Sequence, residues 1–457
     1  MGSPRTTIHA RKAASGGDSS ASALKIVDLR VHSIAIADPP LRSSYGLHAP
    51  YALRNVLELE GEGGLIGIAE TYGGDNPAAA LRGLRDKVVG ADAFRITGEL
   101  LGMVEGEGGG LARSQTDLVP GENPLDAGPR TFAAIETACL DLIGKAVGKP
   151  VCDLLGGRVR DEVPFSAYPF YKHGGGGGEG DDARPDEYGE ALSAEALVRQ
   201  VRQMIARYGF QSVKFKGGVL DPAVEIETIR QLRREFGANV PLRIDPNSAW
   251  TVETSVEVGV ALQEELSGGG YLEDPAAGLE GMAEVRRRLL AAGVDTPLAS
   301  NVAVTSFAHI PQAVKTDAVQ VILSDHHYWG GMRQVQQLGK VCQTFGLGLS
   351  MHSNSHLGVS LIAMAHAAAA TRHLTYACDT HYPWQSAADE IVAGGRVAIV
   401  DGCVRIPDKP GLGVDLDYDQ LARLKERYEK TPYRKRDDEA EMRKHVDGDW
   451  KRVLPRW

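Results

Sequence analysis

The chain has 457 residues, of which 43% are hydrophobic and 24% are charged, and its formal net charge at pH 7 is −10. This length exceeds one ordinary hydrophobic core, so we expect two domains or a barrel with a partner domain. An acidic surface repels nucleic acid and anionic lipid, and no apolar run reaches the ~18 residues of a membrane helix. We therefore expect neither a nucleic acid nor a membrane as partner.

Residues 1–23 are rich in Ser, Gly, Arg and Lys and lack the apolar core of a secretory signal, which predicts a disordered tail. The number of cysteines is odd and no C-x-x-C pair occurs. We therefore expect buried free thiols and a reducing, cytoplasmic location. The cysteines are Cys139, Cys152, Cys342, Cys378 and Cys403.

Residues 24–150 predict an α+β domain that caps the rest of the chain, because strands come first and helices follow. Residues 24–39 alternate apolar and polar side chains, as a strand does. Residues 55–74 predict two strands joined by a glycine-containing turn. Helical patterns follow at residues 79–90 and 132–157.

Residues 151–403 alternate short apolar strands with helices, which predicts a parallel sheet closed into a (β/α)7β barrel, a modified TIM barrel. After an apolar run at residues 163–171, the predicted strands are 212–216, 242–245, 270–273, 297–300, 318–323 and 348–352. The predicted helices are 194–208, 222–236, 252–266, 282–292, 307–314, 332–345 and 361–370. Residues 404–457 form a charged segment that we expect to pack back on the cap.

Six polar residues recur near the ends of these predicted strands at intervals of 29, 28, 28, 24 and 27 residues. One strand–helix unit takes ~30 residues, and a barrel builds its active site from the ends of successive strands. The pattern therefore predicts one catalytic site at the barrel mouth. The six residues are Lys216, Asp245, Glu273, Asn301, Asp325 and His352.

Two glycine-rich stretches occur, at residues 106–110 and 174–178. Acidic residues follow the second stretch, so we interpret it as a flexible surface loop rather than a phosphate-binding loop. Because it follows the first barrel strand, it could also serve as a lid over the mouth.

Asp245, Glu273 and Asn301 supply three oxygen ligands from consecutive strands. Oxygen ligands without thiolate or imidazole suit Mg²⁺, which prefers six of them and would keep about three positions for water and substrate. The arrangement predicts an open, catalytic magnesium site.

Two candidate bases flank this site. Lys214 and Lys216 point to the same side of a strand, and neighbouring cations depress each other's pKa, so Lys216 could act as a base; an exposed pair at a strand edge is the alternative. Asp325 and His352 lie one unit apart, and a carboxylate beside an imidazole fixes its tautomer and raises its basicity. A metal between two bases suggests removal of a proton from carbon next to a carboxylate, with the metal taking up the charge of the enediolate.

These residues resemble the enolase superfamily and, within it, the glucarate dehydratase family. The similarity covers roughly residues 24–440, and Asn301 is its most diagnostic residue, since most branches carry a carboxylate there. Residues 355–358 and 110–130 depart from the family pattern, which leaves the distal substrate end open. The motifs that carry the resemblance are VKFKGGVL, RIDPNSAW, YLEDPAAG, LASNVAVTSF, ILSDHHYWGGM and MHSNSHLGVSLIAMAHAAAA.

The resemblance implies Mg²⁺-dependent dehydration of D-glucarate to 5-dehydro-4-deoxy-D-glucarate. His352, held by Asp325, would remove the C5 proton and then protonate the departing C4 hydroxyl. Lys216 would be the base on the opposite face, for an epimeric acid, with Lys214 assisting and Asn247 stabilising the intermediate. The implied substrate contacts are His48, Tyr168, Ser353, His381 and Arg436.

Three alternatives stay open from the sequence. Tyr168 and His381 could equally serve only the core. The substrate could be another acid sugar, such as galactarate, processed by dehydration or epimerisation. The chain could also be a weakly active paralogue that binds a sugar acid. In each case we expect a small diacid sugar as partner and a homo-oligomeric assembly.

Overall fold

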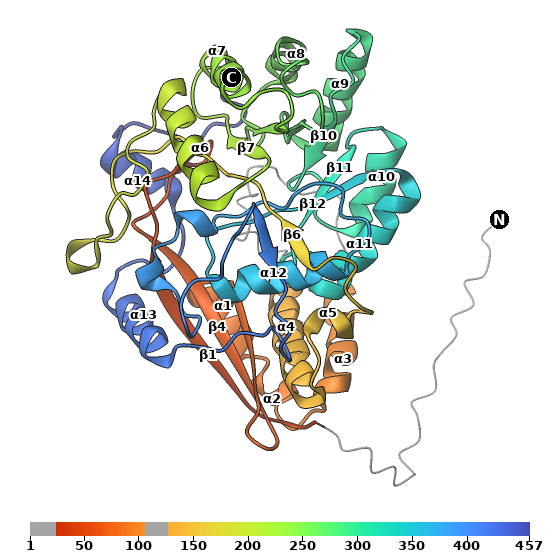
Figure 1. Cartoon of the computed structure of the whole chain (residues 1–457), viewed down its shortest axis with the longest axis vertical. Helices are drawn as coiled ribbons and strands as arrows, with labels where there is room; N and C mark the ends of the chain where they lie inside the picture. Colours follow the sequence, from red (N-terminus) through yellow and green to blue (C-terminus); the bar gives the residue numbers. More distant parts are fainter. Residues whose placement is uncertain (1–23, 106–126) are drawn as a thin grey trace, which may run out of the picture.

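The computed structural model of the chain describes residues 24–105 and 127–457. The predicted tail at 1–23 and the glycine-rich stretch at 106–110 lie outside the described residues. Figure 1 shows the amino-terminal sheet and its helices at one end, the ring of barrel helices at the other, and the carboxy-terminal helices beside the sheet. In the described part of the chain, no helix is long and apolar enough to cross a membrane.

The cap is built on an antiparallel sheet in the order β1 (Ile26–Ala37), β4 (Tyr51–Gly61) and β5 (Ile66–Tyr72). The predicted turn joins β4 to β5 and contains Gly63 and Gly64, both at positive φ (88° and 80°). One cap helix, α4 (Ala127–Val147), packs on β5. A Cβ at Gly67 would lie 2.2 Å from the carbonyl oxygen of Ala138, so only glycine permits this close approach. The other elements are β2 (Arg42–Ser43), β3 (Gly46–Leu47), α1 (Asp75–Arg82), α2 (Arg85–Val88), α3 (Ala93–Glu105) and α5 (Val151–Leu154).

Six parallel strands form the main wall of the barrel, and each pairs with the next along the chain. Short parallel bridges close the ring: Ala167 bridges Val213, and Phe165 bridges Cys378. On the other side Asp379 N donates to the carbonyl of Met351 at 2.9 Å. The predicted (β/α)7β barrel is thereby confirmed. The six strands are β7 (Val213–Lys216), β8 (Leu242–Asp245), β9 (Tyr271–Glu273), β10 (Leu298–Ser300), β11 (Val321–Ser324) and β12 (Gly348–Met351).

The first predicted barrel strand, residues 163–171, is only partly regular. Its start, β6 (Glu162–Pro164), pairs with β13 (Cys403–Arg405) in an antiparallel ribbon, and the rest joins the ring through isolated bridges. Pro164 and Pro169 have no N–H to donate, which interrupts the hydrogen bonding of this segment to its neighbouring strands.

The barrel helices follow their strands, as the alternation predicted. Sequence caps fix two of the starts: the Ser193 side chain accepts from Ala196 N, and Asp221 accepts from Ala223 N with Pro222 in the first turn. The last turns of the predicted helix 252–266 are not α-helical, because the chain turns toward Gly268 and Gly269, both at positive φ. The helices are α6 (Ala194–Tyr208), α7 (Pro222–Phe236), α8 (Val252–Ala261), α9 (Gly278–Ala291), α10 (Ile310–Lys315), α11 (Met332–Phe345) and α12 (Gly358–Ala370).

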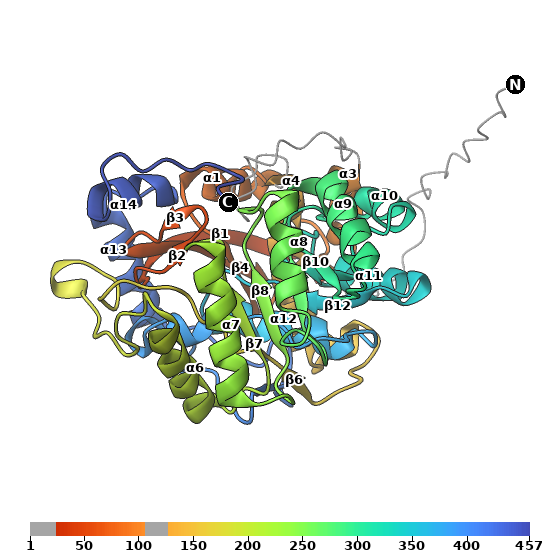
Figure 2. The ribbon, with the colours of Figure 1, turned by 90° about the horizontal axis from the view of Figure 1, so that it is seen from above.

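The carboxy-terminal segment runs from the cap to the barrel, as Figure 2 shows from above. Its helix α13 (Tyr418–Lys430) lies along β1, where Arg427 donates to the Ala35 carbonyl at 3.2 Å. Its helix α14 (Asp438–His445) packs near β3. The final residue, Trp457, donates its N–H to the carbonyl of Ala249, beyond β8, at 3.0 Å.

Two further sequence predictions concern the glycine-rich loop and the cysteines. The glycine-rich loop at 174–178 contacts the cap, where Gly178 N donates to the Pro50 carbonyl at 2.8 Å. The cysteines are free thiols as predicted, and four of them are buried. Cys403 is only half-buried, because β13 lies at the outer edge of the barrel floor.

A buried carboxylate of the cap, Glu70, contacts the barrel. Glu70 on β5 pairs with Arg54 on β4 at 2.8 Å, and both side chains are almost fully buried. The same carboxylate accepts the N–H groups of Leu357 and Ser360 at 2.9 Å, at the start of the barrel helix α12. A carboxylate satisfies the free donors at a helix amino terminus and complements the helix dipole, so Glu70 fixes the cap to α12.

We predict that Glu70→Ala lowers the free energy of unfolding by about 3–5 kcal/mol, since it leaves Arg54 buried beside an empty position and α12 without its cap. Denaturant unfolding measures the change. The control is Glu62→Ala in the exposed turn, which should change stability by less than about 0.5 kcal/mol. Equal, small effects of both substitutions would contradict the anchoring role.

Candidate active site

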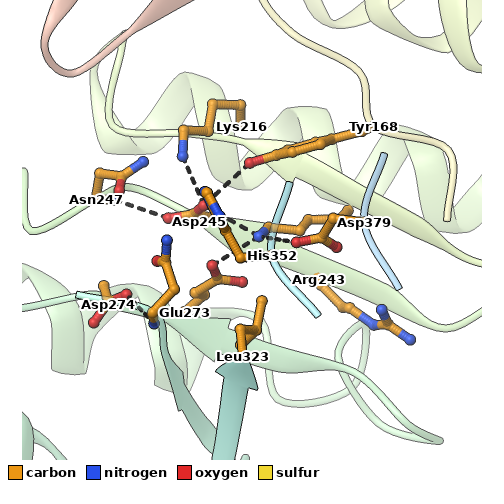
Figure 3. Close-up of polar contacts among 12 residues, drawn as sticks. Tyr168, Lys216, Arg243, Asp245, Asn247, Glu273, Asp274, Leu323, His352 and Asp379 are labelled. Carbon is orange, nitrogen blue, oxygen red and sulfur yellow. Dashed lines mark hydrogen bonds and ion pairs between the residues drawn. The ribbon is translucent and has the colours of Figure 1, made fainter. Parts of the chain in front are cut away.

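The polar residues that end the barrel strands converge at one mouth, as Figure 3 shows. Asp245 ends β8, Glu273 ends β9 and Asn301 follows β10, and their exposed fractions are 0%, 0% and 3%. Lys216, from the end of β7, and His352, just beyond β12, lie beside them. The structure thus brings together the residues that the interval along the chain selected.

The two lysines of β7 contact different carboxylates. Lys214 Nζ lies 2.7 Å from Glu273 Oε1, 2.6 Å from Asp379 Oδ2 and 3.4 Å from Asp245 Oδ2. Lys216 Nζ lies 2.7 Å from the same Asp245 oxygen. Burial alone would lower the pKa of Lys214, but Asp379 and Glu273 outweigh it and raise that pKa well above its usual value.

The prediction that the two lysines depress each other's pKa is therefore wrong for Lys214. Its carboxylate neighbours come from other parts of the chain, and their attraction exceeds the repulsion between the ammonium groups. Lys214 is a fixed cation of the site.

The pKa values of the buried carboxyl groups differ because their neighbours differ. Burial would raise the pKa of Asp245, but Lys216 and Lys214 overcome it and lower the pKa to about 2. Burial and the nearby charge of Asp245 raise the pKa of Glu273 well above its usual value. Burial also raises the pKa of Asp274, which accepts from the Ser300 hydroxyl at 2.6 Å, to about 6. If all were ionised, these carboxyl groups and Asp379 would carry more negative charge than the two lysines neutralise.

The donor set fits a divalent cation that prefers oxygen. Glu273 Oε2 is buried and has no hydrogen-bond partner within residues 24–105 and 127–457. The amide oxygen of Asn301 lies 3.2 Å from Glu273 Oε1 and 2.9 Å from Asp274 Oδ2, so oxygens face one another. Turning the amide over would convert these contacts into hydrogen bonds, with the amide oxygen then 3.3 Å from His352 Nε2. A cation between the oxygens would relieve the same repulsion, and two carboxylates with an amide suit Mg²⁺.

The imidazole of His352 is oriented by Asp325. His352 Nδ1 lies 2.9 Å from Asp325 Oδ2, which leaves Nε2 directed at Asn301. Burial lowers the pKa of His352, and the contact with Asp325 raises it without cancelling the effect of burial. Asp325 thus acts on the pKa in the predicted direction, but burial of the imidazole outweighs it. The fixed tautomer places a lone pair on Nε2, as a base requires.

Sequence reasoning missed two residues that bind the dyad carboxylate. His327 Nδ1 lies 2.7 Å from Asp325 Oδ1, and the hydroxyl of Tyr72 donates to Asp325 Oδ2 at 3.2 Å. Tyr72 belongs to the cap strand β5, so no barrel periodicity could have selected it. The dyad is completed by the cap.

Asp379, which binds Lys214, was also missed, although the sequence contains its signal. It lies 27 residues after His352, which continues the same interval. The eighth segment of the ring forms few regular strand hydrogen bonds, and its sequence shows only a weak strand pattern.

Asp325, His326 and His327 also place possible ligand atoms within 4.8 Å of one another. Asp325 is engaged by two histidines there, and imidazole ligands suit zinc better than magnesium. The oxygen set at Asp245, Glu273 and Asn301 remains the better candidate for a magnesium site.

The predicted substrate contacts fall into two groups. Tyr168 donates to Asp245 Oδ2 at 3.3 Å, and Ser353 Oγ lies 2.8 Å from His381 Nδ1, so these three residues line the deep part of the site. His48, held by Asp38 at 2.9 Å, and Arg436 line a cavity of about 580 Å³ between cap and barrel.

Asn247 follows β8 and adopts a positive φ of 49°, with its backbone N–H donated to Asp245 Oδ1 at 3.1 Å. Both polar atoms of its side-chain amide are buried and have no hydrogen-bond partner in the described part of the chain. Figure 3 shows the amide beside Lys216 and Asp245, where it is free to donate to a ligand.

A family model described as "Enolase C-terminal domain-like" matches residues 196–421. The chain belongs to the enolase superfamily and is an enzyme of that superfamily. A probable glucarate dehydratase of Streptomyces coelicolor is 44% identical over 450 residues, which cover 95% of this chain and 99% of that protein.

Solved structures agree with this assignment. An enolase from Pseudomonas fluorescens with bound magnesium, potassium and tartrate has a TM-score of 0.87 and 44% identity, over 95% of this chain and 100% of that one. An enolase from Thermobispora bispora with magnesium and formate has a TM-score of 0.85 and 45% identity, over 95% and 100%.

We predict that Tyr72→Phe lowers kcat about five- to tenfold and changes KM less, because it removes one donor from Asp325. Steady-state kinetics separate the two parameters. Tyr51→Phe is the matched control, since this cap hydroxyl contacts the Glu179 carbonyl instead, at 3.4 Å. An unchanged kcat in the Tyr72 variant would show that His352 does not depend on the cap.

Proposed function

We propose that this chain is a Mg²⁺-dependent acid-sugar dehydratase whose substrate is D-glucarate. The observation that carries the proposal is the position of His352 Nε2, which lies 3.3 Å from the amide of Asn301 and so beside the set of oxygen ligands. A base at that position can reach the carbon next to a carboxylate that the metal holds. The similarity to a probable glucarate dehydratase along nearly its whole length supports the substrate class.

Asp245, Glu273 and Asn301 would hold the Mg²⁺, which when bound supplies a Lewis acid for the negative charge of the enediolate. Lys214 adds a fixed positive charge beside the same carboxylates, and Asn247 offers its free amide as a donor to the substrate. The tartrate bound in the Pseudomonas fluorescens relative supports recognition of a small diacid.

His352 would take the C5 proton of D-glucarate on Nε2 while Asp325 holds the Nδ1 hydrogen and stabilises the imidazolium. The imidazolium would then give this proton to the departing C4 hydroxyl, which leaves as water. Tautomerisation of the resulting enol yields 5-dehydro-4-deoxy-D-glucarate. One histidine thus serves as base and then as acid on one face of the substrate.

Lys216 would be the base on the opposite face and would act on an acid that is epimeric at the reacting carbon. Its ammonium group contacts the predicted metal ligand Asp245 at 2.7 Å, which places it beside the ligand set. A protein that only binds a sugar acid needs neither base. The complete set therefore favours an enzyme over a binding paralogue.

The test is ketone formation from D-glucarate by the purified protein, with and without Mg²⁺ and with galactarate in parallel. We expect a ketodeoxy product from D-glucarate that requires Mg²⁺. Product from galactarate but not from D-glucarate would mean that the protein catalyses the proposed reaction on a different substrate. Folded, metal-loaded protein that yields neither product would overturn the proposal.

We predict that His352→Asn reduces turnover of D-glucarate by more than ~10³-fold, since the residue is both base and acid. Calorimetry should show Mg²⁺ affinity close to that of the unaltered protein, because the three oxygen ligands remain. Near-normal turnover in this variant would refute the assigned role.

Lys216→Ala should slow removal of the proton from the opposite epimer more than from D-glucarate. Exchange of that proton with deuterated water, followed by NMR for each epimer, measures the two faces separately. Because Lys216 also contacts Asp245, Mg²⁺ is kept saturating in both assays. Equal losses for the two epimers would argue against a base on each face.

A further inference from the structure

A second cavity, of about 470 Å³, lies at the end of the barrel opposite to the candidate active site. Gln211, Pro241 and Gly269 line it from the positions that precede β7, β8 and β9. Cys403, from the β6–β13 ribbon, and Tyr376, from the eighth segment of the ring, complete the wall. The cavity is therefore separate from the cluster of catalytic residues.

A buried arginine reaches this cavity from inside the barrel. Arg243 lies two positions before Asp245 on β8, so its side chain enters the same interior one layer lower. Figure 3 shows its guanidinium directed away from the cluster around Lys216. The residue is 2% exposed, and Nη1 donates to Ser166 Oγ and to the Ala377 carbonyl, each at 3.0 Å.

The positive charge of Arg243 has no acidic counterpart among the residues that the structure describes. Among the described residues, no carboxylate forms an ion pair with it, and its Nε is buried without an acceptor. The acids one layer above, Glu273 and Asp379, contact Lys214 instead. Asp401 lines the same cavity but is exposed and does not pair with the guanidinium. A buried guanidinium without an anionic partner is costly, so binding of an anion there would be favourable.

Two tyrosines hold the guanidinium in place. The ring centroids of Tyr271 and Tyr376 lie 5.0 and 5.4 Å from its central carbon. Cation–π contacts of this kind stabilise the charge and restrict its motion, but they leave the edge of the guanidinium free to donate. The arginine is therefore prearranged to meet a ligand.

We propose that this cavity binds a small organic acid, with the carboxylate against Arg243 and the apolar part against the wall. Arginine is suited to carboxylates because its N–H groups match their oxygens. Nη1 is already shared between two protein acceptors, which leaves room for a planar carboxylate rather than a fully coordinated phosphate. Pro164, Phe165 and Pro241 give the cavity wall an apolar part, which suits an organic body.

Gln211 allows a test that does not disturb the barrel interior. It is an exposed residue of the cavity wall, and its side chain donates a hydrogen bond to the nearby Gly209 carbonyl at 2.7 Å. Gln211→Lys adds a positive charge to the wall and Gln211→Glu a negative one. Damage to the structure would weaken binding in both variants, whereas an anion site responds with opposite signs.

The probe is benzoate, titrated calorimetrically into the full-length protein at low ionic strength, with inorganic phosphate in a parallel titration. We expect Gln211→Lys to tighten benzoate binding about fivefold and Gln211→Glu to weaken it about fivefold. Arg243→Met should abolish binding at this site. Arg436→Gln, which alters the cavity at the other end of the barrel, should leave the affinity unchanged.

Several results would overturn the proposal. These are no benzoate binding, equal binding by both Gln211 variants, or binding that is lost in Arg436→Gln and retained in Arg243→Met. Phosphate that binds as tightly as benzoate, with the same dependence on Gln211, would show an inorganic anion site and refute the assignment to an organic acid. If Arg243→Met does not fold, the two Gln211 variants still decide.

Discussion

The burial of four carboxylates around two ammonium groups constrains the rest of this active site. Asp245, Glu273, Asp274 and Asp379 each have an exposed fraction of 0%. Lys214 contacts three of them and is held charged by that contact. Burial, together with the negative charge of Asp245, disfavours ionisation of Glu273 and raises its pKa. A divalent cation would neutralise this excess and would satisfy the oxygen atoms that have no donor.

The base is organised by a different set of contacts, which couples the two parts of the fold. Asp325 accepts from His352 and His327 of the barrel and from Tyr72 of the cap. The Glu70–Arg54 pair fixes the cap strand that carries Tyr72 to the start of α12. The cap therefore does more than cover the mouth, because it helps to set the tautomer of the base. The cap must therefore be docked correctly on the barrel for the dyad to form.

The barrel could be predicted from the sequence wherever the local pattern was strong. The bounds of α6, α7, β8 and α11 agree with the predicted ranges to the residue, because caps and periodicity coincide there. The first and eighth segments of the ring were weakly signalled, since proline and irregular bridges replace a regular ladder.

The sequence predicted which residues form the site better than it predicted their pKa values. The strand interval selected Asp245, Glu273 and His352, and the structure brings them together. The pKa of Lys214 could not be predicted from its neighbour Lys216, because Asp379 lies 165 residues away along the chain. The contribution of Tyr72 likewise depends on tertiary contact between domains. Distant partners decide the charge state of a buried group, and spacing along the chain does not reveal them.

The most direct test of a metal site among buried carboxylates is a calorimetric titration of Mg²⁺ at pH 7 in buffers of different ionisation enthalpy, with Glu273→Gln in parallel. Because the pKa of Glu273 is raised in the absence of metal, Mg²⁺ binding should release protons from the unaltered protein. The variant should bind Mg²⁺ at least about tenfold more weakly and release fewer protons. Equal affinity and equal proton release in the two proteins would contradict the account.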